Sequence, residues 1–285
     1  MANIELTPLR DISAFRKLAL GTWVTAKDPS VYGSMDVRME KSIAYMEAFR
    51  QRTGVRLTVT HLVTKALADA LRKCPEALAI SRFSRIYVRD HIDISILVVQ
   101  TDLGQGKVDL AAAKVNDVDK KSLYQLAQEI ERQVQKVRAR EDAAMEKGKR
   151  TTGLVPNFLV GWFLDLVAFL TYTLNLNLSR FGIPRDPFGG ATVTNIGSLG
   201  LDTAYVPLVP YTRVPIFIAP GAIKDAPVIE GNQVIPGKIM RMNATFDHRF
   251  IDGYHTHVLA KTIAAYFDDP FKHFDDIDSL PVKEG

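Results

Sequence analysis

The sequence contains a single cysteine, Cys74, among its 285 residues. One cysteine cannot form a disulfide within the chain, and such usage fits a reducing, intracellular compartment. Because Cys74 falls within a helical apolar pattern, we interpret it as a small buried residue and not as a nucleophile. The first residues, Met1 to Leu6, lack the apolar core of a secretion signal. We therefore expect no export and a cytoplasmic protein.

Several other classes of function also lack their usual signals. Lys and Arg are spread along the chain, and residues 132–150 mix both signs of charge, so we expect no nucleic-acid partner. The glycines of residues 189–200 do not follow the strand-to-helix pattern of a phosphate loop. His255 and His257 lie two residues apart on a predicted helix and would point in different directions, so we expect no metal site.

Hydrophobic residues make up 47% of the chain, enough for the core of one large domain or two small ones. Alternation and helical spacing of apolar residues predict a mixed α/β arrangement. Strands are predicted over 32–39, 93–99, 107–115, 191–195 and 235–245, with a hairpin over 223–234, and helices over 42–53, 58–73, 119–147 and 256–267.

The most informative stretch, residues 245–254, joins the last predicted strand to the last predicted helix. It contains Asp247, His248, Arg249, Asp252 and Gly253. A histidine on such a turn can take a proton from a thiol or hydroxyl near neutral pH. The aspartate could hold the loop by pairing with an arginine. A charged surface turn would have the same composition, so the stretch alone leaves both interpretations open.

This stretch resembles the D-H-R-x-x-D-G signature of the acyltransferase (E2) catalytic domains of 2-oxo acid dehydrogenase complexes, which share their fold with chloramphenicol acetyltransferase. Residues 192–197 are similar to a second family motif, T-x-S-N-x-G, with Thr194 in place of the serine. The resemblance covers nearly the whole chain outside residues 150–188. It implies one α/β (α+β) catalytic-type domain over residues 1–285, with a two-layer fold in which helices pack on a central mixed β-sheet.

The resemblance also implies an activity, the transfer of an acyl group between thiols. His248 would be the general base that takes the proton of an acceptor thiol, most simply that of coenzyme A. Thr194 would donate a hydrogen bond to the oxyanion, and Asn195 and Gly253 would lie against the substrate. Arg16 would form an ion pair with Asp252 and fix the histidine loop.

In the family the histidine and the hydroxyl come from neighbouring subunits around a threefold axis, so the resemblance implies a homotrimer. The acidic tail, residues 268–285, lacks the short apolar end with which the family locks trimers into a cage. We therefore expect a trimer in preference to a cage. We also expect a stand-alone module, with no lipoyl domain before residue 1 and no covalently bound lipoyl.

Two departures from the family support a different class of protein. The predicted strand over residues 107–115 carries Asp109 and a run of alanines where the family has an apolar, proline-containing channel strand. Residues 77–79 replace a family asparagine. The alternative is therefore a non-catalytic, E2-like oligomeric scaffold. Binding of coenzyme A would distinguish the two.

An apolar segment within residues 150–188 has no counterpart in the family. It is nearly long enough to span a bilayer, but Asp165 near its middle disfavours insertion. A spanning helix would also separate strands that must share one sheet. Three interpretations remain for the segment: an oligomer interface or lid, a surface over residues 154–178 for a partner protein or membrane, or an extra core layer.

Overall fold

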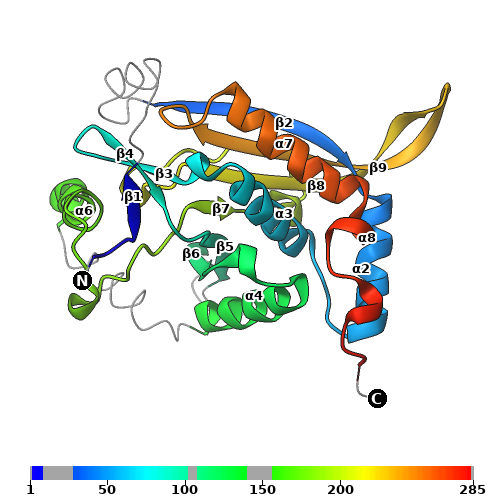
Figure 1. The fold of residues 1–285 in the computed structure, drawn as a ribbon, viewed down its shortest axis with the longest axis horizontal. Coiled ribbons are helices and arrows are strands. Elements are labelled where there is room, and N and C mark those ends of the chain that lie inside the picture. Colours follow the sequence, from blue (N-terminus) through cyan, green and yellow to red (C-terminus); the bar gives the residue numbers. More distant parts are fainter. Residues whose placement is uncertain (1, 9–27, 102–107, 140–155, 284–285) are drawn as a thin grey trace.

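The computed structural model describes residues 2–8, 28–101, 108–139 and 156–283. Its main feature is a six-stranded mixed sheet with the strand order β2-β9-β8-β7-β5-β6 (Figure 1). The three strands β8, β7 and β5 run parallel, and the other neighbours are antiparallel. The strands are β2 (Ser30–Arg38), β5 (Ile94–Thr101), β6 (Val108–Val115), β7 (Ala191–Val193), β8 (Ile216–Glu230) and β9 (Gln233–Asp247).

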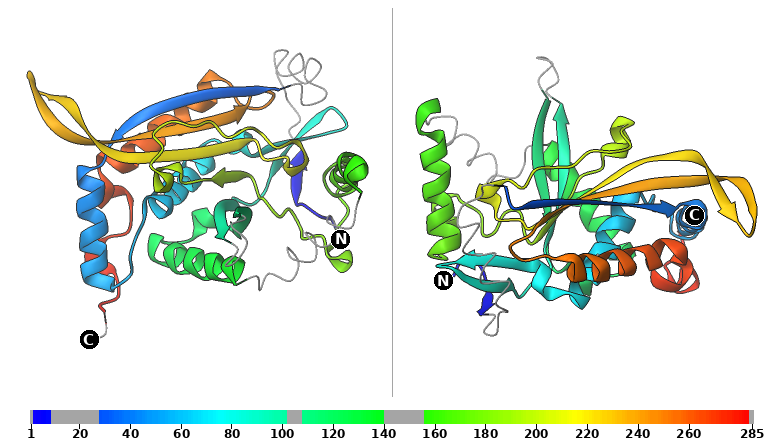
Figure 2. Two further views of the ribbon diagram at one scale, coloured as in Figure 1. Left: turned by 180° about the vertical axis from the view of Figure 1, so that it is seen from behind. Right: turned by 90° about the horizontal axis from the view of Figure 1, so that it is seen from above.

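Helices pack against this sheet and enclose the core. They are α2 (Glu40–Thr53), α3 (Val59–Lys73), α4 (Leu123–Arg138), α7 (Gly253–Asp268) and α8 (Pro270–His273). The central one is α3, which contacts α7, α4, β7 and β8 (Figure 2). Its side chains Leu62, Leu67 and Leu71 are fully buried, as their helical spacing predicts. Thr58 and His61 form a reciprocal cap at its start.

The helix predicted over residues 119–147 begins later than expected. In the structure α4 starts at Leu123, because Ser122 and Gln125 form a reciprocal cap at its first turn. Asp119 belongs instead to a short 3-10 turn, η2 (Val118–Lys120). The helix also ends earlier than predicted, at Arg138, with Ala139 as its C-cap, and residues 140–147 lie outside the described residues.

The hairpin predicted over residues 223–234 is the tip of a much longer one. The strands β8 and β9 pair from Ile216–Phe246 to Glu230–Gln233, with a register shift between Pro220 and Ile223, and Gly231 turns between them with a φ of 61°. This hairpin continues through the sheet to Asp247, so it delivers the residues of the His248 turn to one end of the sheet.

A second, three-stranded sheet has the order β1-β4-β3, with β1 at Leu6–Pro8, β3 at Ala79–Arg82 and β4 at Arg85–Arg89. It supports the segment that follows residue 155. There, η3 (Asn157–Leu159) and α6 (Val160–Ala168) lead into a π-helical turn, η4 (Phe169–Thr173), and a later 3-10 turn, η5 (Ser179–Phe181). Ala168 and Tyr172 pack on Ile4 and Ile80 beneath them.

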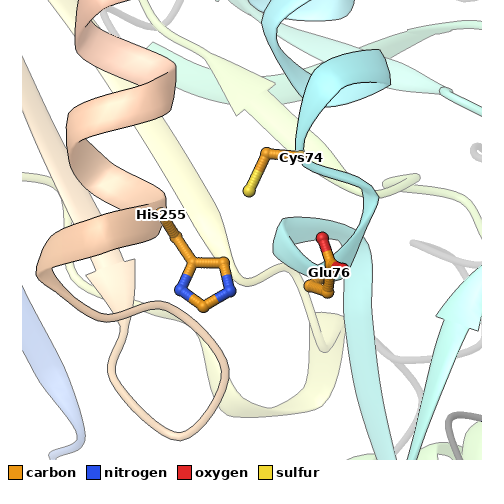
Figure 3. Close-up of side chains that lie close together, drawn as sticks. All are labelled: Cys74, Glu76 and His255. Atoms are coloured by element: carbon orange, nitrogen blue, oxygen red, sulfur yellow. The ribbon is translucent and has the colours of Figure 1, made fainter.

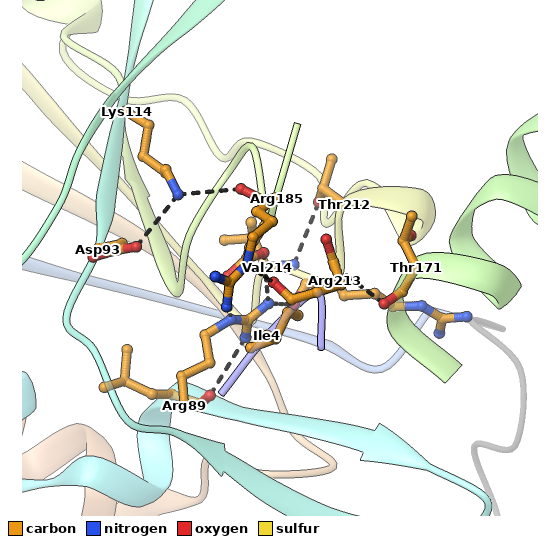
Figure 4. Close-up of polar contacts among 12 residues, drawn as sticks. Ile4, Arg89, Asp93, Lys114, Thr171, Arg185, Thr212, Arg213 and Val214 are labelled. Carbon is orange, nitrogen blue, oxygen red and sulfur yellow. Dashed lines mark hydrogen bonds and ion pairs between the residues drawn. The ribbon is translucent and has the colours of Figure 1, made fainter. Parts of the chain in front are cut away.

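Polar contacts fasten this segment to the N-terminal residues and to the rim of the main sheet (Figure 4). Asn3 donates to the carbonyl of Thr171 over 3.0 Å. Arg89 forms a buried ion pair with Asp186, with 3.0 Å between Nε and Oδ2. The ammonium of Lys114 donates to Asp93 and to the carbonyl of Arg185, each over 3.3 Å.

The opposite side of α6 is an apolar stripe formed by Phe158, Trp162, Leu166 and Phe169. These side chains are 80%, 80%, 55% and 45% exposed. The segment is therefore not an interior layer of the single chain. Among the described residues, every helix is too short or too polar to cross a bilayer.

Candidate active site

His248 lies in a tight turn between β9 and α7. The backbone amide of Asp247 donates to the carbonyl of Pro215, and that of His248 donates to the carbonyl of Pro29. Asp247 and Arg249 form a buried ion pair, with 2.6 Å between Oδ2 and Nη2, and Asp247 also accepts from the Arg249 amide. These contacts fix the turn from both sides of the histidine.

The imidazole of His248 is half-buried and its orientation is set by the turn itself. Nδ1 lies 2.8 Å from the carbonyl oxygen of Ile251. Because a carbonyl can only accept, Nδ1 carries the proton and donates it. The lone pair of the neutral ring therefore resides on Nε2, which is the arrangement that a general base requires.

Asp252 caps the start of α7. Its Oδ1 accepts from the backbone amides of Tyr254 and His255, over 3.0 and 3.3 Å, and lies 2.6 Å from Nδ1 of His255. His255 was not predicted as a partner of Asp252, although their D-x-x-H spacing at the start of α7 forms a capping box in the structure. Arg16 lies outside the described residues, so its predicted ion pair with Asp252 stays a prediction.

Gly253, the first residue of α7, is exposed. A Cβ built at this position would meet nothing within 4 Å among the described residues. Neither backbone conformation nor crowding within the described chain accounts for a glycine there. The missing side chain leaves open space beside the His248 turn.

Thr194 and Asn195 follow β7 directly. The amide of Thr194 donates to the carbonyl of Ile218, and its side chain is half-buried. Asn195 uses its amide group within the chain: Oδ1 accepts from Ser198, and Nδ2 lies 3.3 Å from the hydroxyl of Thr60. The structure thus gives Asn195 a capping role in a 3-10 turn, η6 (Ile196–Leu199).

The sheet register separates Thr194 from His248 within one chain. Thr194 follows the β7–β8 pairs and is level with Ala219, which pairs with Asn243 on β9. His248 comes five residues after Asn243, which corresponds to roughly 17 Å along the strands. The strand β8 also lies between β7 and β9. The two groups do not meet in a single chain.

A cleft of about 250 Å³ adjoins the turn, and Asp247, Arg249, Tyr32, Pro210 and Arg213 are among the residues that line it. Burial lowers the pKa of Arg213, and the positive charge of Arg249 lowers it further. Two guanidinium groups, those of Arg213 and Arg249, therefore line the cleft next to the His248 turn.

The predicted channel strand is present as β6, paired with β5 at the end of the sheet. Ala111, Ala112 and Ala113 are all buried. The side chain of Asp109 lies outside the described residues. Residues Ala77 and Leu78, which stand near the missing family asparagine, are buried in a 3-10 turn, η1 (Pro75–Leu78).

The sequence matches the family model described as 2-oxoacid dehydrogenases acyltransferase (catalytic domain) over residues 9–152 and 187–274. The chain belongs to this acyltransferase family. The two matched parts leave residues 153–186 between them.

Curated relatives agree with this membership. The chain is 25% identical over 220 residues to the dihydrolipoyllysine-residue acetyltransferase component of the acetoin cleaving system of Bacillus subtilis, covering 77% of this chain and 44% of the relative. It is 27% identical over 226 residues to the succinyltransferase component of the 2-oxoglutarate dehydrogenase complex of Haemophilus influenzae, covering 79% and 44%. The chain thus spans about half the length of the curated relatives it matches.

Solved structures confirm the predicted fold. A probable dihydrolipoamide acetyltransferase from Listeria monocytogenes has a TM-score of 0.63 at 18% identity and covers 97% of this chain and 98% of its own. The dihydrolipoamide acetyltransferase of Azotobacter vinelandii has a TM-score of 0.62 at 18% identity, with 93% of each chain covered.

Proposed function

We propose that the chain transfers acyl groups between thiols, with coenzyme A as one of them. Nε2 of His248 takes the proton of the acceptor thiol, and the thiolate sulfur attacks the carbonyl carbon of an acyl thioester. The new carbon–sulfur bond forms while the carbonyl oxygen becomes an oxyanion. When the intermediate collapses, the bond to the departing sulfur breaks, and His248 returns the proton to that leaving thiolate.

The observation that carries this proposal is the hydrogen bond from Nδ1 of His248 to the carbonyl of Ile251. A free thiol is mostly protonated near neutral pH, so a base with its lone pair directed away from the turn raises the reactive thiolate fraction. Family membership supports the reaction class.

Thr194 is the proposed donor to the oxyanion. Its hydroxyl can donate one hydrogen bond, as the family serine would. Since Thr194 and His248 do not meet within one chain, we propose that each site forms between two copies, His248 from one and Thr194 from its neighbour. A closed ring of such head-to-tail contacts gives a homotrimer or a larger assembly built from it.

A mixing experiment tests both the chemistry and its placement. His248→Ala and Thr194→Ala assemblies are each expected to be inactive in acyl transfer from acyl-coenzyme A. After dissociation and reassembly at equal amounts, about a quarter of the wild-type activity should return, because each interface draws its two groups independently. His257→Ala, at an exposed position of α7, serves as the control with full activity.

Two results would contradict this proposal. Full activity in the His248→Ala protein would remove the base. Inactive single variants that stay inactive after mixing, although their chains co-assemble, would place both groups of one site on the same chain.

A second candidate function is a non-catalytic scaffold that keeps the fold and docks through the apolar stripe. The exposure of Phe158, Trp162, Leu166 and Phe169 favours it, because large exposed apolar patches mark interaction sites. Calorimetry with coenzyme A separates the two candidates, since the scaffold has no need to bind it. A Trp162→Glu variant that loses flotation with liposomes, or loses a partner protein, would support docking by the stripe.

A further inference from the structure

Three potential metal ligands meet beside the candidate active site, although they come from distant parts of the sequence. Cys74 ends α3, Glu76 lies in η1, and His255 lies in the first turn of α7. One ligand atom from each lies within 4.8 Å of the others. Figure 3 shows the three side chains directed toward a common point.

The sequence predicts no metal at His248, His255 and His257, because His255 and His257 would point in different directions and no cysteine or well-spaced carboxylate cluster accompanies them along the chain. In the structure, the imidazole of His255 instead lies beside Cys74, Glu76 and Asp252. Its Nδ1 lies 2.6 Å from Oδ1 of Asp252, the length of a charge-assisted hydrogen bond. Because the carboxylate accepts, Nδ1 carries the proton and donates it. With Nδ1 engaged by a carboxylate, Nε2 is the ligand atom, and this carboxylate–histidine pairing is how proteins orient metal-binding histidines.

Cys74 is the buried member of the three. The residue is 3% exposed. Its sulfur lies within 4.8 Å of a Glu76 carboxylate oxygen, and a divalent cation between them would offset that negative charge and bind the thiolate form of Cys74.

We propose that Cys74 Sγ, a Glu76 carboxylate oxygen and His255 Nε2 bind a divalent cation of the zinc class. One sulfur, one imidazole nitrogen and one carboxylate oxygen form a ligand set that suits Zn²⁺ and disfavours Mg²⁺ or Ca²⁺. In tetrahedral zinc the ligand atoms are roughly 3.5 Å apart, so side-chain movements of about 1 Å would close the site. Glu76 is half-buried, which leaves the fourth position open to water.

Such a metal would cross-link the end of α3 to the start of α7. It would also hold His255 against Asp252, the residue that caps α7 after the His248 turn. This consequence for the turn rests on the proposed acyltransferase function. Metal binding itself does not, because it depends only on the three ligands.

Binding of Co²⁺ to the metal-free protein tests the proposal without any activity assay. We expect one equivalent to bind, with a thiolate-to-cobalt charge-transfer band, and Zn²⁺ to displace it. Cys74→Ser should abolish the band, and His255→Gln or Glu76→Gln should weaken affinity at least tenfold. His257→Gln, two residues further along α7 and exposed, is the matched control and should bind as the wild type does.

Circular dichroism would establish that each variant is folded. If Cys74→Ser fails to fold, His255→Gln and Glu76→Gln still test the site, because Glu76 is only half-buried. Asp252→Asn should weaken affinity about 10–100-fold, since it acts on the metal through His255. Absence of the charge-transfer band in the wild type, or equal Co²⁺ affinity in wild type and His255→Gln, would overturn the site. Either result leaves the acyltransferase proposal untouched.

Discussion

Thr194 and His248 stand at different levels of one sheet, with β8 between their strands. A proton transfer and an oxyanion contact must both reach the same thioester, and each needs hydrogen-bond distance. In the proposed reaction, the single chain would therefore contribute two half-sites, one at the end of β7 and one after β9. Everything in the proposed reaction depends on how a second copy brings them together.

Thr194 provides the most direct test of the oxyanion half-site. Replacing it with Ala should lower kcat by about 10²–10³, equivalent to about 2.7–4 kcal/mol, because the donor acts mainly on the charge of the transition state. Thr194→Ser keeps the hydroxyl and should retain most of the rate. Steady-state kinetics with an acyl-coenzyme A donor would measure both. Equal losses in the two variants would mean that the hydroxyl is not the donor.

Local pattern was sufficient for much of this fold. The apolar spacing of α3, its Thr58 start and the strand leading to Asp247 all appear where the sequence placed them. Each depends on side-chain periodicity and capping, which act over a few residues. The resemblance to a known family supplied the fold class, a central mixed sheet with helices packed on it, and the solved structures confirm that class.

Contacts between segments that are distant in the sequence could not be predicted from local periodicity and capping. Asn3 meets Thr171, and Cys74 meets His255, across more than 160 residues of sequence in each case. Spacing along the chain relates His255 to His257 and His248, which are close in sequence, but it does not show that Cys74 and Glu76 lie beside it. The apolar stripe was likewise visible as composition, but only packing shows which side of α6 faces outward.

His91 should make the stability of the N-terminal strand depend on pH. Its ring bonds Asp117 over 2.9 Å and Glu5 over 2.7 Å, and these two contacts raise its pKa, the one to Asp117 more strongly. A raised histidine pKa stabilises the fold fully below the unfolded value of about 6.5, and this contribution is lost as the pH rises through the folded pKa. The side chain is 42% exposed, so solvent keeps the effect small.

The measurement compares thermal melts of the wild type and His91→Gln at about pH 6 and about pH 8.5. The gap in Tm between the two proteins should be wider at the lower pH. His257→Gln, on an exposed part of α7, controls for the loss of an imidazole. A gap that does not change with pH would show that the protonated ring adds nothing to stability.

The Arg89–Asp186 ion pair should be costly to break from one side. The side chain of Arg89 is only 2% exposed, and its guanidinium also donates to the carbonyls of Leu78 and Arg213. Arg89→Met would leave the carboxylate of Asp186 buried without its cation, at a cost of about 3–5 kcal/mol in the free energy of unfolding. Urea unfolding would measure the change.

A surface pair offers the comparison for this effect. Lys224 and Asp202 lie 2.6 Å apart, with side chains 47% and 31% exposed. Lys224→Met should cost no more than about 1 kcal/mol, because solvent screens the exposed pair. If both substitutions cost the same, burial does not set the strength of the Arg89–Asp186 contact.

Gly197 should be intolerant of any side chain, because two backbone segments touch there. A Cβ on Gly197 would lie 2.3 Å from the carbonyl oxygen of Gly221 and 2.5 Å from its carbonyl carbon. Gly197→Ala must therefore push η6 away from β8. This shift would destabilise the fold and displace Thr194, which lies three residues before Gly197.

Gly161, within α6, has open space around its Cβ position. Gly161→Ala should instead stabilise the helix by about 0.5–1 kcal/mol, since alanine loses less backbone entropy. Urea unfolding of both variants, with acyl transfer assayed in parallel, would measure the change in the free energy of unfolding, which we expect to be opposite in sign for the two. A Gly197→Ala protein with wild-type stability and rate would show that the two backbones are not in contact.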